Sequence, residues 1–206
     1  MESTILVGAG YWDGAPEGIA TQGLFNLSPD TGDWVSVTDG LPENVEVRGL
    51  ALRGSTIYAG TQIGPCRSTD GGKSWILQDL PGAERVVWSI MPVGASTLYV
   101  GAEGTSIYKS EDDGDTWRLL DVPAPTGLVR MGFPTRVVRL AHDPANPDEI
   151  YAGLEVGGVV RSFDGGESWT DCSAHLIELS HQDHLRSRIG SDTDAEGMLD
   201  SHALVV

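Results

Sequence analysis

Long apolar runs and basic residues are both scarce in this 206-residue chain. No stretch of about 18 consecutive apolar residues occurs, which argues against a transmembrane helix. The opening residues, MESTILVGAGYWDG, lack a basic start and a long apolar core, so we expect no secretory signal. Lys and Arg total 13 against 30 Asp and Glu, a net charge of −17. This charge argues against nucleic acids and membranes as partners, because both are anionic.

Cysteine and helical periodicity are scarce as well. Cys66 and Cys172 stand in unrelated contexts without the spacing of a metal site, so we expect two reduced thiols in a cytoplasmic protein without a cofactor. No stretch sustains an apolar period of 3.6 residues, so helix should be rare. The 27 glycines and 11 prolines, with 40% apolar residues, instead indicate a folded chain rich in tight turns.

A short polar motif that ends in tryptophan occurs three times. It reads STDGGKSW at 68–75, SEDDGDTW at 110–117 and SFDGGESW at 162–169, so its first serines are 42 and 52 residues apart. A shorter copy, SPDTGDW at 28–34, begins 40 residues before the first. Such spacing is typical of an internal structural repeat.

Short β-rich runs accompany each copy of the motif. Around the first full copy they are VEVRGLAL (45–52), IYAG (57–60) and GPCRS before the motif, and ILQDL after it. Four short strands in a unit of about 40–50 residues, joined by Gly and Asp turns, are typical of a β-propeller blade. We therefore predict a single all-β domain over 1–206, a β-propeller of four-stranded antiparallel blades. The predicted blades cover about 4–38, 45–80, 85–122 and 136–172, followed by a crossover insertion at 173–199.

The pattern Ser-x-Asp-x-Gly-x-Ser/Thr-Trp resembles the Asp box of the bacterial neuraminidase repeat, and the resemblance covers the chain to about residue 172. That repeat occurs in sialidases, xyloglucan-degrading glycoside hydrolases, sortilin-type receptors, photosystem II assembly factors and many uncharacterised bacterial propellers. Its members usually carry six or more blades. The resemblance therefore implies that the four blades belong to a propeller of six to eight.

The residue types of the motif predict a structural role for it. Aspartate accepts hydrogen bonds from turn N–H groups, glycine adopts positive φ, and tryptophan buries its ring between blades. The residues expected to build these corners are Asp30, Trp34, Ser68, Asp70, Gly72, Trp75, Ser110, Asp112, Gly114, Trp117, Ser162, Asp164, Gly166 and Trp169.

The long insertions fall on the opposite face of the predicted propeller. If the strands of a blade are A to D from the inside out, the boxes are C–D turns. The insertions 11–23, 123–135 and 173–199 are B–C loops or D–A crossovers, which lie at the other end of the blades. Long loops at one end of a rigid scaffold tend to carry binding groups, so we expect any ligand on this loop face.

Two insertions supply the candidate ligand-binding residues. They are Trp12, Asp13, Glu17, His181, Asp183, His184, Arg186, Arg188 and Glu196. Trp12 beside carboxylates suits either sugar stacking or anchoring of its loop. Several interpretations of 173–199 stay open: a metal site with His181 and His184, an incomplete calcium loop with Asp192 and Asp194, or an arginine clamp for a carboxylate or phosphate. A fourth interpretation is a solvated loop or short helix held by its own ion pairs. We predict no metal.

No catalytic set can be recognised in the sequence. Similarity to sialidases would imply an early Arg-Ile-Pro motif, which is absent; the nearest string is RIG at 188–190. A glycosidase needs two carboxyl groups about 5–10 Å apart. We therefore predict a scaffold that binds a protein or glycan on the loop face, with a glycoside hydrolase using carboxylates of that face as the alternative. A mouth lined with basic residues would favour binding.

The two ends of the chain are complementary in strand type. The chain opens on a B strand, and SHALVV (201–206) has the pattern of an A strand. Pairing of the two would close a ring of four blades. The alternative, which we favour, is that 200–206 begins the next blade of a longer propeller.

Overall fold

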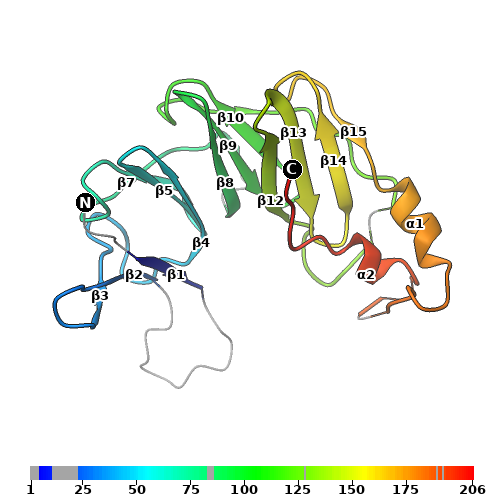
Figure 1. Cartoon of the computed structure of the whole chain (residues 1–206), viewed down its shortest axis with the longest axis horizontal. Helices are drawn as coiled ribbons and strands as arrows, with labels where there is room; N and C mark the ends of the chain where they lie inside the picture. Colours follow the sequence, from blue (N-terminus) through cyan, green and yellow to red (C-terminus); the bar gives the residue numbers. More distant parts are fainter. Residues whose placement is uncertain (1–4, 11–22, 83–85, 128, 189, 192) are drawn as a thin grey trace.

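The computed structural model describes residues 5–10, 23–82, 86–127, 129–188, 190–191 and 193–206. Its strands form four antiparallel sheets in chain order (Figure 1). The strands are β1 (Leu6–Ala9), β2 (Gly23–Leu27), β3 (Trp34–Ser36), β4 (Val47–Arg53), β5 (Thr56–Thr61), β6 (Gly64–Ser68), β7 (Ile76–Leu77), β8 (Val87–Val93), β9 (Thr97–Ala102), β10 (Ile107–Ser110), β11 (Arg118–Leu119), β12 (Val137–Asp143), β13 (Asn146–Leu154), β14 (Gly158–Ser162) and β15 (Thr170–Asp171). Among the described residues, no helix is long and apolar enough to cross a membrane.

The sheets are the predicted blades. Blades 2, 3 and 4 are four-stranded meanders in the orders β4-β5-β6-β7, β8-β9-β10-β11 and β12-β13-β14-β15. In the described residues, blade 1 has three strands in the order β1-β2-β3. The prediction of a propeller built from antiparallel blades is confirmed.

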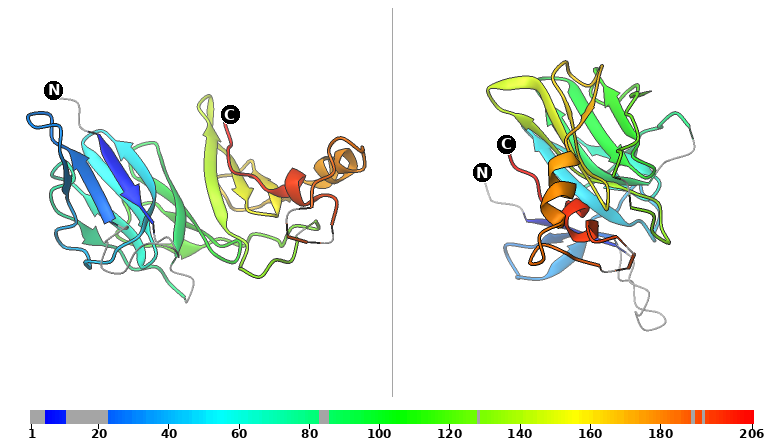
Figure 2. Two further views of the ribbon diagram at one scale, coloured as in Figure 1. Left: turned by 90° about the horizontal axis from the view of Figure 1, so that it is seen from below. Right: turned by 90° about the vertical axis from the view of Figure 1, so that its right-hand side faces the viewer.

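The four blades form an open arc rather than a ring (Figures 1 and 2). Residues 201–206 form no strand with β1. Instead, the Ser201 N–H donates to the Leu154 carbonyl of blade 4, at 3.3 Å. The described residues therefore do not form a closed ring of four blades.

Each junction between blades repeats one close contact. A glycine of the B strand faces the first valine of the next blade's inner strand. A Cβ at Gly8, Gly60 or Gly101 would lie 2.6, 2.6 or 2.4 Å from a methyl carbon of Val47, Val87 or Val137, respectively. Atoms at these distances would overlap, so only glycine lets successive inner strands approach this closely.

The box tryptophans of the later blades pack across the junctions. Trp75 is 3% exposed and belongs to a cluster that includes Leu24 of blade 1, and Trp169 packs in the same way with Tyr99 of blade 3. Trp117 packs, partly buried, against a cluster with Tyr58 of blade 2. The burial predicted for these rings between blades is present at all three junctions.

The shortened copy at 28–34 departs from the prediction. Trp34 is 51% exposed, because no blade precedes blade 1 among the described residues. The N–H of Gly32 bonds to the main-chain oxygen of Ser28, at 2.9 Å, and no hydrogen bond to the Asp30 carboxylate exists within the described chain. Asp30 and Trp34, expected among the residues that build the corners, therefore do not form the corner seen in the full boxes, whose turn is one residue longer.

The three full boxes share one hydrogen-bond network. In the second, the Asp112 carboxylate accepts from the Thr116 N–H at 2.8 Å, the Thr116 hydroxyl at 2.6 Å and the Ser110 hydroxyl at 2.8 Å. The Ser110 hydroxyl oxygen in turn accepts from the N–H of Gly114, whose φ is +90°. Asp70 and Asp164 make the matching bonds. These carboxylates close their own turns.

The same bonds lower the pKa values of the box aspartates. Donation from the Thr116 hydroxyl and amide lowers the pKa of Asp112 to about 2, and Ser168 does the same for Asp164, also to about 2. The pKa of Asp70 is lowered further by Ser74. Hydrogen bonds to the ionised form stabilise it, so protonation of these groups opposes folding.

We expect acid to unfold the chain partly through these boxes. A depressed native pKa contributes stability that is present above the unfolded value, about 3.9, and lost as pH falls toward about 2. Asp112→Asn should be less stable than wild type at pH 6, and the difference should shrink below about pH 4. Thermal midpoints followed by circular dichroism would measure this, with exposed Glu43→Gln as control. A deficit that stays constant across this pH range would contradict the assignment.

Both cysteines are free thiols. Cys66 is buried in blade 2, and burial raises its pKa to about 12, whereas Cys172 is exposed. Cys66 is therefore protonated and inert at neutral pH.

Candidate functional site

Hydrogen bonds between turns define two opposite ends of the blades. At one end, B–C turns bond to the crossovers: Glu46 N–H donates to Gln62 Oε1 at 2.7 Å, and Glu155 N–H to the Arg136 carbonyl at 2.9 Å. At the other end, boxes bond to A–B turns, as in Asp113 N–H to the Ser96 carbonyl at 2.9 Å. The loop face and the box face of the sequence prediction are therefore distinct ends of the structure.

Part of the predicted loop-face site falls outside the described residues. This is so for Trp12, Asp13, Glu17 and Asp192. The other candidates belong to the rim segment, residues 173–199, at the end of the arc beside blade 4 (Figure 1). It contains two short helices, α1 (Ala174–Ser180) and α2 (Glu196–Leu199), which pack through Leu176, Ile177 and Leu199.

The arginines of the rim segment pair with its own carboxylates. Arg186 lies 3.3 Å from Asp183 and 3.7 Å from Asp194, and Arg188 Nε donates to Asp194 Oδ1 at 2.5 Å. The Arg188 hydrogen bond lowers the pKa of Asp194. The segment is thus held by ion pairs between its own residues. Asp194, one of the two aspartates of the predicted calcium loop, is used in these pairs.

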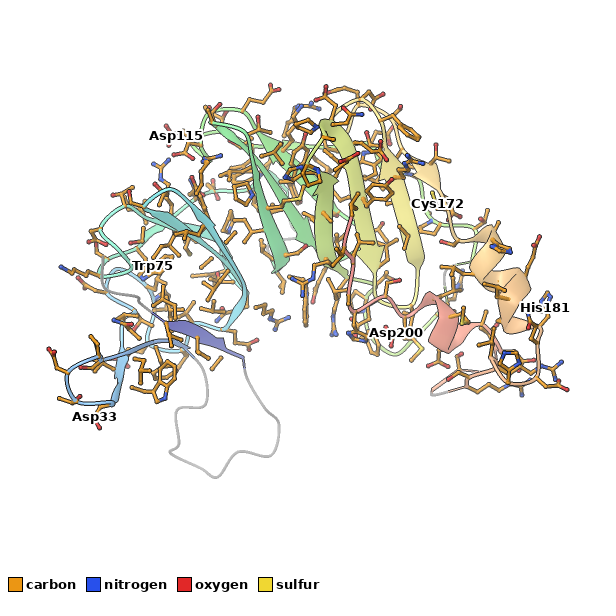
Figure 3. The ribbon with its side chains drawn as sticks, viewed as in Figure 1. Asp33, Trp75, Asp115, Cys172, His181 and Asp200 are labelled. Carbon is orange, nitrogen blue, oxygen red and sulfur yellow. The ribbon has the colours of Figure 1, made fainter. Side chains whose placement is uncertain are left out.

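The remaining rim candidates are arranged differently. Glu196 is 1% exposed, and its carboxylate accepts from the Ser191 N–H at 2.8 Å and the Ser191 hydroxyl at 2.6 Å. It therefore closes its own turn instead of facing solvent. His181 and His184 are both exposed, and Figure 3 shows His181 at the far end of the segment. In the described part of the chain, no group of three His, Cys, Asp or Glu side chains could hold a metal ion.

The residues that come together are on the inner strands instead. The guanidinium carbons of Arg48 (β4) and Arg136 lie 3.9 and 4.2 Å from the ring centroid of Trp88 (β8). Arg136 also lies 4.7 Å from the Phe133 ring. These four residues form the inner-strand cluster. Cations at such distances from aromatic rings are attracted by the ring quadrupole, which fixes the side chains relative to one another.

Two half-buried ion pairs hold this cluster in place. Arg48 Nε donates to Glu46 at 3.2 Å, and Arg136 Nη1 donates to Glu155 at 2.9 Å. The side chains of all four are only 15–22% exposed. Both glutamates belong to the turns of the loop face, so the cluster lies where the inner strands meet that face.

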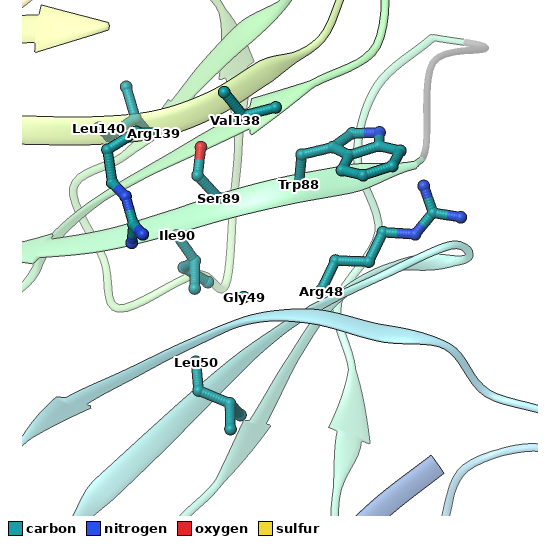
Figure 4. Close-up of a pocket in the computed structure, with 9 residues that line it drawn as sticks. All are labelled: Arg48, Gly49, Leu50, Trp88, Ser89, Ile90, Val138, Arg139 and Leu140. Carbon is teal, nitrogen blue, oxygen red and sulfur yellow. The ribbon is translucent and has the colours of Figure 1, made fainter. Parts of the chain in front are cut away.

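A shallow pocket of about 80 Å³ adjoins the cluster (Figure 4). It is lined by Arg48, Gly49, Leu50, Trp88, Ser89, Ile90, Val138, Arg139 and Leu140. The inner strands that line the pocket lie close together. The Ser89 hydroxyl donates to the Val137 carbonyl at 2.7 Å, and a Cβ at Gly49 would lie 3.2 Å from the Trp88 carbonyl oxygen. Of the residues that the structure describes, two guanidinium groups and an indole line the pocket and no carboxylate does.

Arg139 is the exposed cation of this pocket. In the chain as described, its guanidinium has no ion-pair partner, unlike those of Arg48 and Arg136. Figure 4 shows it extending from β12 across β8. Sequence reasoning assigned Arg48, Trp88 and Arg139 only to strands. The available signal was their place just after a crossover, within the first three positions of each inner strand.

Comparison with known proteins yields relatives of much greater length. No family model matches the chain. A xyloglucanase of Hypocrea jecorina (strain QM6a) is 26% identical over 183 residues, which are 86% of this chain and 18% of that protein. A probable oligoxyloglucan-reducing end-specific xyloglucanase of Neosartorya fischeri is 29% identical over 77 residues, 37% of this chain and 9% of that protein.

Solved structures agree with the observed architecture. An ancestral GH74 enzyme superposes with a TM-score of 0.58 and 20% identity, over 72% of this chain and 21% of its own. The GH74 enzyme of Niastella koreensis gives 0.56 and 21%, over 73% and 27%. The fold is that of a β-propeller. At these sequence identities, the similarity to solved structures shows the fold alone. The chain spans under a third of the length of each of these relatives.

Proposed function

We propose that this chain is a propeller scaffold that binds a protein or carbohydrate ligand at the loop-face end of its inner strands. The observation that carries the proposal is the lining of the pocket, whose described residues include Arg48, Trp88 and Arg139 and no carboxylate. Glycoside hydrolysis requires two carboxyl groups flanking one bond. A pocket lined by cations and an indole is suited to recognition instead.

The chemistry of the pocket favours a ligand with an anionic or hydroxyl-rich edge. Among the described residues, Arg48 is paired with Glu46, whereas Arg139 has no ion-pair partner and can donate to a ligand. A guanidinium donates two parallel hydrogen bonds to a carboxylate or to neighbouring hydroxyls. The protein as a whole is acidic, with a net charge of −17. An anionic ligand is therefore attracted only close to the arginines of the pocket.

Hydrolysis of xyloglucan is the second candidate function. The 26% identity with a xyloglucanase favours it. Two carboxylates of the loop face, those of Glu46 and Glu155, are held by arginines of the inner-strand cluster. A hydrolase would therefore have to use carboxylates elsewhere on the loop face, or blades beyond the four described.

Arg139→Ala should weaken binding at least about tenfold, since a hydrogen bond to a charged group contributes about 1.5–3 kcal/mol. Calorimetric titration with xyloglucan oligosaccharides and with acidic peptides would measure the affinity. Arg186→Ala/Arg188→Ala tests the rim segment, and Arg118→Ala on the outer strand is the control. Equal affinity in Arg139→Ala and wild type would contradict the proposal. Release of reducing sugar from xyloglucan by wild type would favour the hydrolase.

A further inference from the structure

The crossover 123–135 and the rim segment share an apolar core of their own, here the loop-face core, apart from the clusters of the blade junctions. Its side chains are those of Val129, Met131, Phe133, Val156, Leu176, Ile177, Ala195 and Leu199. The packing is close, because a Cβ at Gly127 would lie 2.4 Å from Ile177 Cδ1. The Thr126 hydroxyl also donates to the Asp171 carboxylate at 2.5 Å. The crossover and the rim segment are therefore held together as one unit.

Phe133 belongs to the loop-face core and also to the inner-strand cluster. Its side chain is partly buried against the core. Its ring centroid lies 4.7 Å from the guanidinium carbon of Arg136, and that carbon lies 4.2 Å from the ring centroid of Trp88. The Arg136 guanidinium therefore lies between two aromatic rings, and each ring attracts it. Phe133 thus connects the loop-face core to the inner strands.

Arg48 continues this arrangement on the other side of Trp88. In the arc, β8 lies between β4 and β12 (Figure 1). Arg48 on β4 and Arg136 beside β12 therefore approach the indole from opposite sides, at 3.9 and 4.2 Å from its centroid. Figure 4 shows Arg48 reaching from β4 toward Trp88. The inner-strand cluster is thus a stack in which rings and guanidinium groups alternate from the loop-face core to the pocket.

The Trp88 ring depends on this stack for its position. Its Nε1 is buried and has no hydrogen-bond partner among the described residues. By contrast, Nε1 of Trp75 donates to two main-chain carbonyls. The two arginines of the stack are each anchored by a glutamate of a loop-face turn. Since no hydrogen bond in the described chain orients the indole, the groups packed on its two faces do so.

We propose that Phe133 is a positioning residue of the pocket. By holding Arg136 against Trp88, it fixes the indole and, through the indole, the Arg48 guanidinium, both of which line the pocket. The crossover and the rim segment thereby control the geometry of a pocket whose described lining includes none of their residues. The inference rests on the proposed function only in taking the pocket as the ligand site, because the stack itself can be tested without a ligand.

The ligand-free test is the nuclear magnetic resonance signal of the Arg48 Nε–H group in the full 206-residue chain. This group donates to Glu46 at 3.2 Å, and its guanidinium lies over the Trp88 ring, so the ring current displaces the signal. Phe133→Leu keeps an apolar side chain but removes the ring. We expect it to move the signal toward its position in Trp88→Leu, and Phe133→Tyr, which keeps the ring, to leave the signal in place.

Ile177→Val is the matched control for this test. It removes packing from the same loop-face core, but Ile177 is not a member of the stack. The Arg48 signal should therefore stay at its wild-type position in this variant. Circular dichroism would establish that each variant folds. An Arg48 signal that is unmoved in Phe133→Leu, or moved equally in Ile177→Val, would overturn the proposal.

Binding is measured by calorimetric titration with xyloglucan oligosaccharides and with acidic peptides. Phe133→Leu should weaken the affinity about three- to tenfold, whereas Phe133→Tyr and Ile177→Val should change it less than about twofold. In a Trp88→Leu background, Phe133→Leu should cause no further loss, because its effect passes through the indole. Losses that simply add would overturn the positioning role. If wild type binds neither probe, the proposed function fails, and the Arg48 signal alone decides the role of Phe133.

Discussion

Trp75→Ala is expected to lower the free energy of unfolding by about 3–5 kcal/mol. The ring is 3% exposed and fills the junction between blades 1 and 2. Its Nε1 donates to the Val37 carbonyl of blade 1 at 2.9 Å and to the Gly72 carbonyl of its own box at 3.2 Å. Truncation leaves a cavity and removes the donor that both acceptors use, and the junction cannot collapse to fill that space.

The adjacent residue provides a matched control for this change. Ile76 is 61% exposed on β7, so Ile76→Ala should cost less than about 1 kcal/mol. Urea unfolding followed by far-ultraviolet circular dichroism at a fixed low protein concentration would measure both. If the two variants lost equal stability, the tryptophan would not be supporting the junction.

Gly101→Ala is expected to cost about 1–3 kcal/mol in spite of its added methyl group. The new Cβ would lie 2.4 Å from Val137 Cγ1 and 2.5 Å from the Ser89 Oγ, both on inner strands. Overlap at that distance forces blades 3 and 4 apart, and with them the hydrogen bond from Ser89 to Val137. The cost arises from crowding rather than from a cavity.

Two further variants separate crowding from a general effect of alanine. Gly132→Ala meets no atom within 4 Å and should leave stability unchanged or raise it by about 0.4–1 kcal/mol. Adding Val137→Ala to Gly101→Ala should recover part of the loss, since the two side chains share one space. A double variant that loses the sum of both single changes would show that the close approach is not the cause.

The blades were predictable because their signals are local in the chain. The box, the glycine after the B strand and the alternation of the inner strands each act within a few residues, so the motif spacing predicted blade 2 at 45–80, and its strands run from Val47 to Leu77. The exposure of Trp34 was not predictable from the motif, because burial of that ring depends on a blade before it.

The inner-strand cluster escaped sequence reasoning for a related reason. Arg48, Trp88 and Arg136 belong to different repeat units, about 40–48 residues apart, and only the curvature of the arc brings them together. Glu196 shows the opposite case. The sequence shows that Glu196 lies in a polar segment. It does not show that the turn around Ser191 buries the Glu196 carboxylate.

The repeated glycine–valine contact also bears on how such a chain changes over evolutionary time. Gly8, Gly60 and Gly101 each contact the first valine of the next inner strand, so the same contact occurs at all three junctions. At this contact, a duplicated or deleted gene segment that spans one whole unit would again place a glycine against a valine. The size of such a protein can change in steps of one blade, while a break inside a unit would separate a glycine from the partner it was selected to meet.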